Sequence, residues 1–175
     1  SSVSAPDLSA TATKACIADS KLSAADIDEA IIGCVLPAGI GQAPARQAAL
    51  KAGLPISAGA TTINKVCGSG MKSVMLASDM IKAGSANVVL AGGMESMSGS
   101  PYLLPKAREG YRMGHQEVLD HMFFDGLQNP YDGNMMGHFA EETSKKYNLT
   151  REAQDSFAIE SVQRARAAIE SGAFH

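Results

Sequence analysis

The chain has 175 residues, of which 45% are hydrophobic and 19% charged, a balance typical of a globular domain with a core and unlike that of a disordered chain. Its net charge of −3 offers no broad basic surface for nucleic acid, and no apolar run approaches the roughly 20 residues of a membrane helix. Three widely spaced cysteines predict neither a disulfide framework nor a metal site. With no signal peptide visible either, a cytoplasmic location is the simplest expectation.

The first half of the chain predicts helices and strands in alternation. Residues 4–19 predict a helix that Ser4 caps and that places Pro6 in its first turn. A continuous apolar run over residues 30–36 predicts a strand covered on both faces. Then follow a helix over 44–52, a strand over 61–65, a helix over 70–83 and a fully buried strand over 87–91. This order predicts an α/β sheet with helices on both faces.

Two of the three cysteines are expected in the core. Cys16 shares a face of the first helix with Leu8, Ala12 and Ala15. Cys34 lies inside the apolar strand over residues 30–36. Cysteines in such positions usually pack as small hydrophobic residues.

Cys67 lies where the strand over residues 61–65 turns into the helix over 70–83. That helix begins with small residues, so its first backbone N–H groups are expected to be uncovered in front of the sulfur. The positive end of the helix favours thiolate over thiol, and the N–H groups could bind the carbonyl oxygen of an acyl group. This arrangement is what a nucleophilic cysteine requires, although a lone cysteine among glycines is more often a small packed residue.

The composition changes after Gly92-Gly93. Residues 96–132 hold most of the aromatic residues and form a stretch too long for an ordinary connection, which predicts an inserted loop region. A short helix is expected within it, near residues 116–124.

Two more helices are expected at the end of the chain. Asn134 is predicted to cap a helix that runs to about Tyr147, and Thr150 is predicted to cap one that runs to Gly172. One face of the last helix carries Phe157, Ala158, Val162, Ala165 and Ile169.

The chain has four histidines that could act as a base: His115, His121, His138 and His175. His138 is the best placed, because it lies in a predicted helix beside Met135 and Met136. A lone histidine in such a position is still more often a structural or surface side chain than a base.

Three segments in sequence order carry a resemblance to one family. Residues 64–72 have the sequence N-K-V-C-G-S-G-M-K, and residues 88–98 have the sequence V-V-L-A-G-G-M-E-S-M-S. The third segment is Met135-Met136-Gly137, followed by Ala140-Glu141. Together they resemble the thiolases, and acetyl-CoA acetyltransferases look most similar.

The resemblance implies a thiolase-like layered α/β fold, with a mixed sheet, helices on both faces and the start of an inserted loop domain. Residues 1–95 would form the N-terminal core domain without its first strand. Residues 96–133 would form a loop region that covers coenzyme A. Residues 134–175 would form helices of the loop domain or return to the core.

The resemblance also implies a reaction: reversible acyl transfer between coenzyme A thioesters, from two acetyl-CoA to acetoacetyl-CoA and CoA. Cys67 would carry the acyl group, and its own backbone N–H would bind the acyl oxygen. Met135 and Met136 would line the substrate pocket, although some short-chain thiolases have a histidine where this chain has Met135. The expected partners are acyl-CoA or CoA and further copies of the chain in a tetramer. No permanently bound cofactor, no metal, no nucleic acid and no membrane is expected.

Other motifs of the family do not occur in the sequence. These are the Gly-His-Pro segment of the activating histidine, the Cys-x-Gly-Gly segment of a second cysteine, and an Asn-Glu segment that positions a water. The chain is therefore expected to be an internal piece that carries only the nucleophile and is inactive alone. Two alternatives remain: a ketoacyl-synthase type of condensing enzyme, and an inert fragment that acts only in subunit contacts.

Overall fold

The structure is a computed structural model that describes residues 3–173. The chain divides into two compact units, Ser1–Leu127 and Gln128–His175. One of the candidate bases, His175, lies outside the described residues. The domain boundaries expected after residues 95 and 133 remain expectations.

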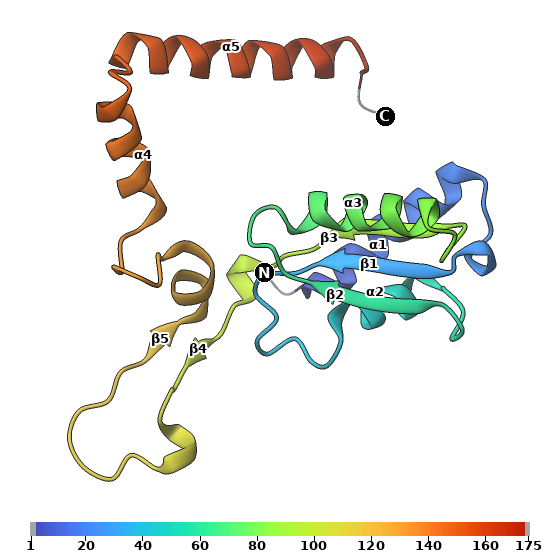
Figure 1. Cartoon of the computed structure of the whole chain (residues 1–175), viewed down its shortest axis with the longest axis horizontal. Coiled ribbons are helices and arrows are strands. Elements are labelled where there is room, and N and C mark those ends of the chain that lie inside the picture. Colours follow the sequence, from blue (N-terminus) through green and yellow to red (C-terminus); the bar gives the residue numbers. More distant parts are fainter. Residues whose placement is uncertain (1–2, 174–175) are drawn as a thin grey trace. The chain divides into compact units, whose positions relative to one another are not determined.

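The first unit is built on a parallel sheet of three strands, β1 (Glu29–Gly33), β2 (Gly59–Ile63) and β3 (Val89–Gly93). The strand order is β2-β1-β3, and both pairs are parallel (Figure 1). The predicted α/β class is confirmed. The sheet of the described residues is wholly parallel and not mixed, because a helix connects each strand to the next and returns the chain to the same end.

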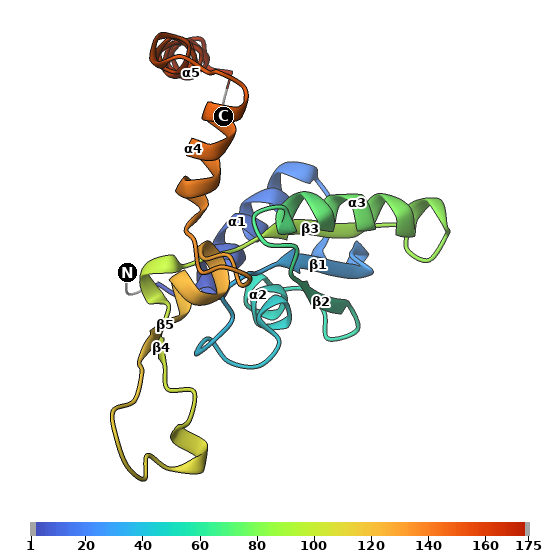
Figure 2. The same cartoon turned by 60° about the vertical axis from the view of Figure 1, so that its left-hand side comes forward.

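Helices cover both faces of this sheet, as predicted (Figures 1 and 2). Side chains alternate along β1, so Ala30 and Ile32 pack into the clusters formed with α1 (Ala5–Ser20) and α2 (Pro44–Ala52). Gly33 points to the other face, where it meets α3 (Ser69–Lys82).

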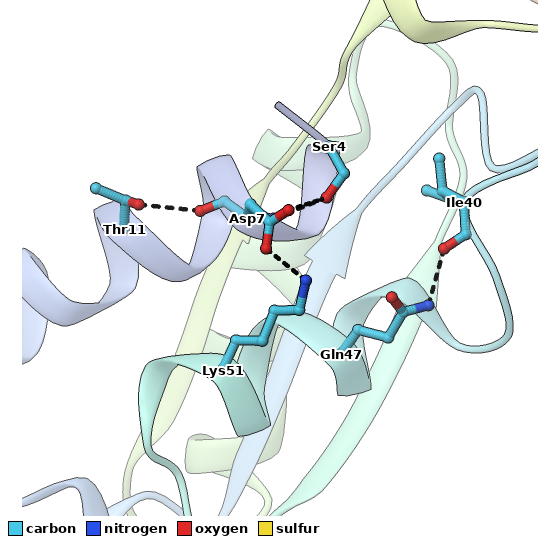
Figure 3. Close-up of polar contacts among 6 residues, drawn as sticks. All are labelled: Ser4, Asp7, Thr11, Ile40, Gln47 and Lys51. Atoms are coloured by element: carbon cyan, nitrogen blue, oxygen red, sulfur yellow. Dashed lines mark hydrogen bonds and ion pairs between the residues drawn. The ribbon is translucent and has the colours of Figure 1, made fainter. Parts of the chain in front are cut away.

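Local signals set the helix ends close to where the sequence places them. Ser4 caps α1 by accepting the Asp7 N–H at 3.3 Å, and Gly53 ends α2 in the left-handed region with a φ of +98°. Figure 3 shows the ion pair between Asp7 and Lys51 that links the two helices. It also shows Gln47 donating to the Ile40 carbonyl at 3.0 Å, which ties α2 to the loop that precedes it.

Burial differs from expectation at two places. Cys34 is buried as predicted, but the prediction for Cys16 is wrong, because α1 turns Ser9, Ala10 and Thr13 inward and leaves Cys16 exposed. The strand β3 is only half-buried, since it lies at an edge of the described sheet. On α3 the small residues face the sheet and the large apolar ones are exposed: Met71, Val74, Met75 and Ile81.

The long region after β3 has little regular structure. Two short strands, β4 (Tyr102–Leu103) and β5 (Leu119–Asp120), pair antiparallel. The helix expected near residues 116–124 is instead a π-helical segment, η4 (Met122–Leu127). Three 3₁₀ turns complete the first unit: η1 (Ala24–Asp26), η2 (Met97–Gly99) and η3 (Ala107–Glu109).

The second unit holds two helices, α4 (Met136–Lys146) and α5 (Arg151–Glu170). Thr150 caps α5 as predicted, by accepting the Ala153 N–H at 3.1 Å. Met135, and not Asn134, is the cap residue of α4, because the helix begins only at Met136. Asn134 belongs to the preceding turn, where its N–H donates to the Asp132 carboxylate at 2.9 Å. The apolar stripe of α5 is exposed to solvent.

Adding a side chain at Gly33 should destabilise the first unit. A Cβ atom at this position would lie 2.5 Å from the Ser69 Cβ and 2.7 Å from the Ser69 carbonyl carbon. We expect Gly33→Ala to lower the free energy of unfolding by about 1–3 kcal/mol, the usual cost of overpacking. Urea unfolding measures it, with Gly92→Ala as the control, because a Cβ at Gly92 meets nothing within 4 Å. Equal stability of the two variants would contradict the packing.

Asp28 should make stability depend on pH. The backbone N–H groups of Asn87 and Val88 donate to its carboxylate and lower its pKa below the ordinary value of 3.8. A carboxyl whose pKa is lowered by folding stabilises the fold above 3.8 and loses that contribution as the pH falls through its folded pKa.

We therefore expect Asp28→Ala to be less stable than the unchanged chain at neutral pH, with a difference that shrinks below pH 3.8. Urea unfolding across this range tests it. Asp19→Ala, which removes an exposed carboxylate near the end of α1, should lose no stability at neutral pH. A difference for Asp28→Ala that is constant with pH would contradict the assignment.

Candidate active site

The carboxyl ends of the three parallel strands meet at one edge of the sheet, where open α/β sheets usually bind ligands. A cavity of about 290 Å³ opens there. It is lined by residues at or after the ends of the three strands: Gly33, Val35, Val66, Cys67, Ser69, Gly70, Gly93, Met94 and Glu95.

Cys67 lies on the turn between β2 and α3, as the sequence predicts, and it is exposed. Gly68 is the cap residue of α3, so Cys67 lies one residue before the cap. The turn is tight, because the Gly68 N–H donates to the Lys65 carbonyl at 3.1 Å and the Ser69 N–H donates to the Val66 carbonyl at 3.0 Å.

Two side chains brace this turn from within. The Ser69 hydroxyl accepts the Lys65 N–H at 2.8 Å and donates to the Val66 carbonyl at 2.6 Å. The Asn64 side-chain oxygen accepts the Val66 N–H at 2.8 Å. These bonds satisfy the backbone groups that the sharp turn would otherwise leave unpaired.

Val66 has a φ of +46°, in the left-handed region. A β-branched residue rarely adopts this conformation, which costs of order 1–3 kcal/mol and persists only where surrounding contacts enforce it. The strained residue directly precedes Cys67, and the bonds from Asn64 and Ser69 hold it in place. No pattern in the sequence signals this conformation, because valine there favours an extended strand.

Small residues let α3 approach the strand ends closely. A Cβ at Gly93 would lie 3.3 Å from the Gly70 Cα, and the Ser69 side chain fills the space above Gly33. The buried Ser73 hydroxyl lies 2.6 Å from the Gly70 carbonyl of its own helix and 2.9 Å from the Gly92 carbonyl, so it is within hydrogen-bond distance of both. The first turn of α3 is thereby brought against the cavity that contains Cys67.

The cavity also contains a carboxylate whose interactions the sequence does not reveal. Glu95 accepts the backbone N–H groups of Val35 and Leu36, each at 2.9 Å, and its carboxylate lies 3.6 Å from the Cys34 sulfur. Burial, and after it the nearby Glu95 charge, raises the pKa of Cys34 to about 11. Cys34 is therefore a neutral thiol at physiological pH. The signals for Glu95 in the sequence are its place after a strand and two glycines and its membership of the segment over residues 88–98, and neither reveals these bonds.

Met135 and Met136 belong to the second unit. Met135 directly precedes α4, and Met136 is its first residue. Both residues are exposed to solvent, Met135 to 37% and Met136 to 50%. Their proximity to Cys67 stays a prediction.

Among residues 3–173, no histidine lines the cavity at Cys67. His138 is half-exposed and lies 3.3 Å from Glu142 along its own helix. His121 is buried, its Nδ1 is 2.5 Å from Asp125, and the Ala38 N–H points at its Nε2 from 3.4 Å. Both imidazoles thus pair with a carboxylate four residues further along the chain.

The described residues contain no group of three or more histidine, cysteine or acidic side chains that could hold a metal ion. No helix among them is both long enough and apolar enough to cross a membrane.

The three cysteines should differ in reactivity. Cys16 and Cys67 are exposed, whereas Cys34 is 1% exposed and its pKa of about 11 keeps it protonated. Because the thiolate is the reactive form, iodoacetamide at about pH 8 should modify Cys16 and Cys67 and leave Cys34 unmodified. Mass spectrometry of the digested chain measures each site, and adding denaturant should expose Cys34. Modification of Cys34 in the folded chain as fast as Cys16 would contradict the structure.

Comparison with known proteins agrees with this architecture. The family model described as "Thiolase, N-terminal domain" matches residues 1–175. The chain is 53% identical to the acetyl-CoA acetyltransferase of Escherichia coli over 174 residues, which is 99% of this chain and 44% of that protein. It is 50% identical to the acetyl-CoA acetyltransferase of Pseudomonas aeruginosa over 172 residues, which is 98% of this chain and 44% of that protein.

A solved structure shares the fold. The Acat5 thiolase of Ascaris suum, crystallised in complex with coenzyme A, superposes with a TM-score of 0.92 at 41% identity, over 99% of this chain and 45% of that one. The chain thus spans less than half the length of the relatives it matches. The match along its whole length, together with a cysteine turn at the strand ends, shows that the chain belongs to the thiolase family.

Proposed function

We propose that this chain is the nucleophile-bearing part of an acetyl-CoA acetyltransferase. The observation that carries the proposal is an exposed cysteine on a strained turn at the start of α3, within a cavity of about 290 Å³. The names of its relatives and the coenzyme A bound to the Ascaris thiolase support acyl-CoA as the substrate class.

In the first step the Cys67 thiolate attacks the thioester carbonyl of acetyl-CoA. A carbon–sulfur bond to Cys67 forms, the bond to the coenzyme sulfur breaks, and CoA leaves after taking up a proton. The tetrahedral intermediate places negative charge on the former carbonyl oxygen, and the Cys67 backbone N–H is the donor proposed to bind it. The positive end of α3 adds to this stabilisation, because its first turn lies against the cavity.

In the second step another acetyl-CoA loses a proton from its α-carbon, and the carbanion attacks the acetyl group on Cys67. Acetoacetyl-CoA forms, and the cysteine thiolate is released. The reverse sequence cleaves acetoacetyl-CoA with CoA. The bases that move these protons belong to motifs that this sequence does not contain, so we assign none of its histidines to them.

Met135 and Met136 are proposed to line the pocket for the acyl chain, because the polarisable and flexible thioether of methionine suits an apolar group of variable shape. Coenzyme A thioesters act as substrates in this proposal, and no permanently bound cofactor is needed. We also propose a homo-oligomer, a tetramer by resemblance to the family, working in the cytoplasm.

Removing the sulfur tests the proposal in the complete protein that carries this chain. Cys67→Ala should abolish the burst of CoA released when acetyl-CoA is added, and should lower turnover by at least about 10⁴-fold, as expected when a covalent nucleophile is lost. The acetylated cysteine peptide should be absent from its mass spectrum.

Cys16→Ala is the matched control, because Cys16 is the other exposed cysteine and lies on α1. It should keep the full burst and turnover. A normal burst with Cys67→Ala would refute the nucleophile assignment.

A further inference from the structure

We propose that Glu95 is a positioning residue for the cavity of Cys67, acting through the Val35–Leu36 segment. The inference rests on the proposed function, because it concerns how the same site is held in its working geometry. Glu95 follows β3, the segment follows β1, and Cys67 follows β2, so the carboxylate joins the ends of two strands beside the third.

The contacts of Glu95 are specific to a carboxylate. One oxygen accepts the Val35 N–H and the other accepts the Leu36 N–H, each at 2.9 Å. Hydrogen bonds to a charged acceptor are stronger than neutral ones, and here each of the two successive N–H groups has an oxygen of its own. Cys34 directly precedes Val35 in the chain. Its thiol is buried and neutral, so it brings no competing charge to the Glu95 carboxylate.

Val35 and Glu95 both line the cavity that contains Cys67. Val35 therefore forms part of the wall of the site, and Glu95 holds the Val35 and Leu36 N–H groups at that wall. A glutamine at position 95 would keep the volume but present only one acceptor oxygen. Its amide group would then face a backbone N–H, donor against donor.

A second contact connects this wall to the nucleophile turn. The Asn64 side-chain nitrogen lies 3.5 Å from the Val35 carbonyl, a long hydrogen bond, while its oxygen accepts the Val66 N–H at 2.8 Å. Asn64 thus touches both the wall and the strained residue before Cys67. A shift of Val35 is transmitted to Val66, whose left-handed φ of +46° persists only while its contacts hold it.

A purely structural role for Glu95 would be to fasten β1 to β3 and nothing more. The two roles differ in what they change. If Glu95 only connects β1 to β3, its substitution lowers the stability of the enzyme and leaves the turnover of the folded enzyme normal. Loss of a positioning group lowers turnover in enzyme that is fully folded, because a displacement of about 1 Å at a reacting centre is costly.

The test compares Glu95→Gln with Glu160→Gln in the complete protein. Glu160 lies on α5 in an exposed pair with Arg164, so its variant is a matched change of charge outside the site. We expect Glu95→Gln to lower kcat for acetyl transfer by about tenfold or more, with KM for acetyl-CoA changed less than about twofold, at a temperature where circular dichroism shows it folded. Glu160→Gln should leave both constants unchanged. An unchanged kcat for folded Glu95→Gln overturns the proposal.

A double-mutant cycle tests the route through Asn64. Asn64→Asp keeps the acceptor for the Val66 N–H and replaces the group that reaches the Val35 carbonyl. Because both changes release the same segment, their effects on kcat should be non-additive, with the double variant within about twofold of Glu95→Gln. Effects that multiply would overturn the proposed route.

Two further outcomes keep the test decisive. If Glu95→Gln does not fold, Asn64→Asp alone decides, and a normal kcat for it overturns the proposal. Cys67→Ala, measured in parallel, separates this inference from the proposed function. Turnover that survives Cys67→Ala refutes the function, whereas loss with Cys67→Ala and normal kcat with Glu95→Gln refutes only the role of Glu95.

Discussion

The close contact between the first turn of α3 and the ends of β1 and β3 is the constraint on which the site depends. It is possible only because glycines and serines meet there: Gly33 below Ser69, and Gly70 within van der Waals distance of Gly93. Larger side chains would push the helix outward by their own thickness. The contact brings the helix start to the strand ends and leaves Cys67 on a very short turn between them.

A turn this short cannot be built from relaxed backbone. Val66 takes up the strain with a positive φ, and the side chains of Asn64 and Ser69 stabilise it by pairing the backbone groups on either side. The hydrogen bonds within the turn offset the cost of this conformation. The result is an exposed cysteine on a turn that is held at both ends by regular elements.

The same edge of the sheet is tied together by polar bonds between strands far apart in sequence. Glu95 reaches from the end of β3 to the segment after β1, and Asn64 reaches from the end of β2 to that segment. The segment after β1 is therefore held from both sides. In an α/β sheet such cross-strand bonds at the carboxyl edge are what separate a defined cavity from a set of loose loops.

Local chemistry in the sequence determined the order of helices and strands, the caps Ser4 and Thr150, and the strand-to-helix turn at Cys67, because these features depend on neighbouring residues only. Tertiary structure decided what local patterns do not contain. Cys16 is exposed and Cys34 buried, although both lie in apolar patterns, because burial depends on which face of an element meets another. The bonds of Glu95 and the φ of Val66 likewise depend on how the segments after the strands meet. The side of α3 that faces the sheet carries small residues, because the close approach of the helix to Gly33 and Gly93 leaves no room for larger side chains.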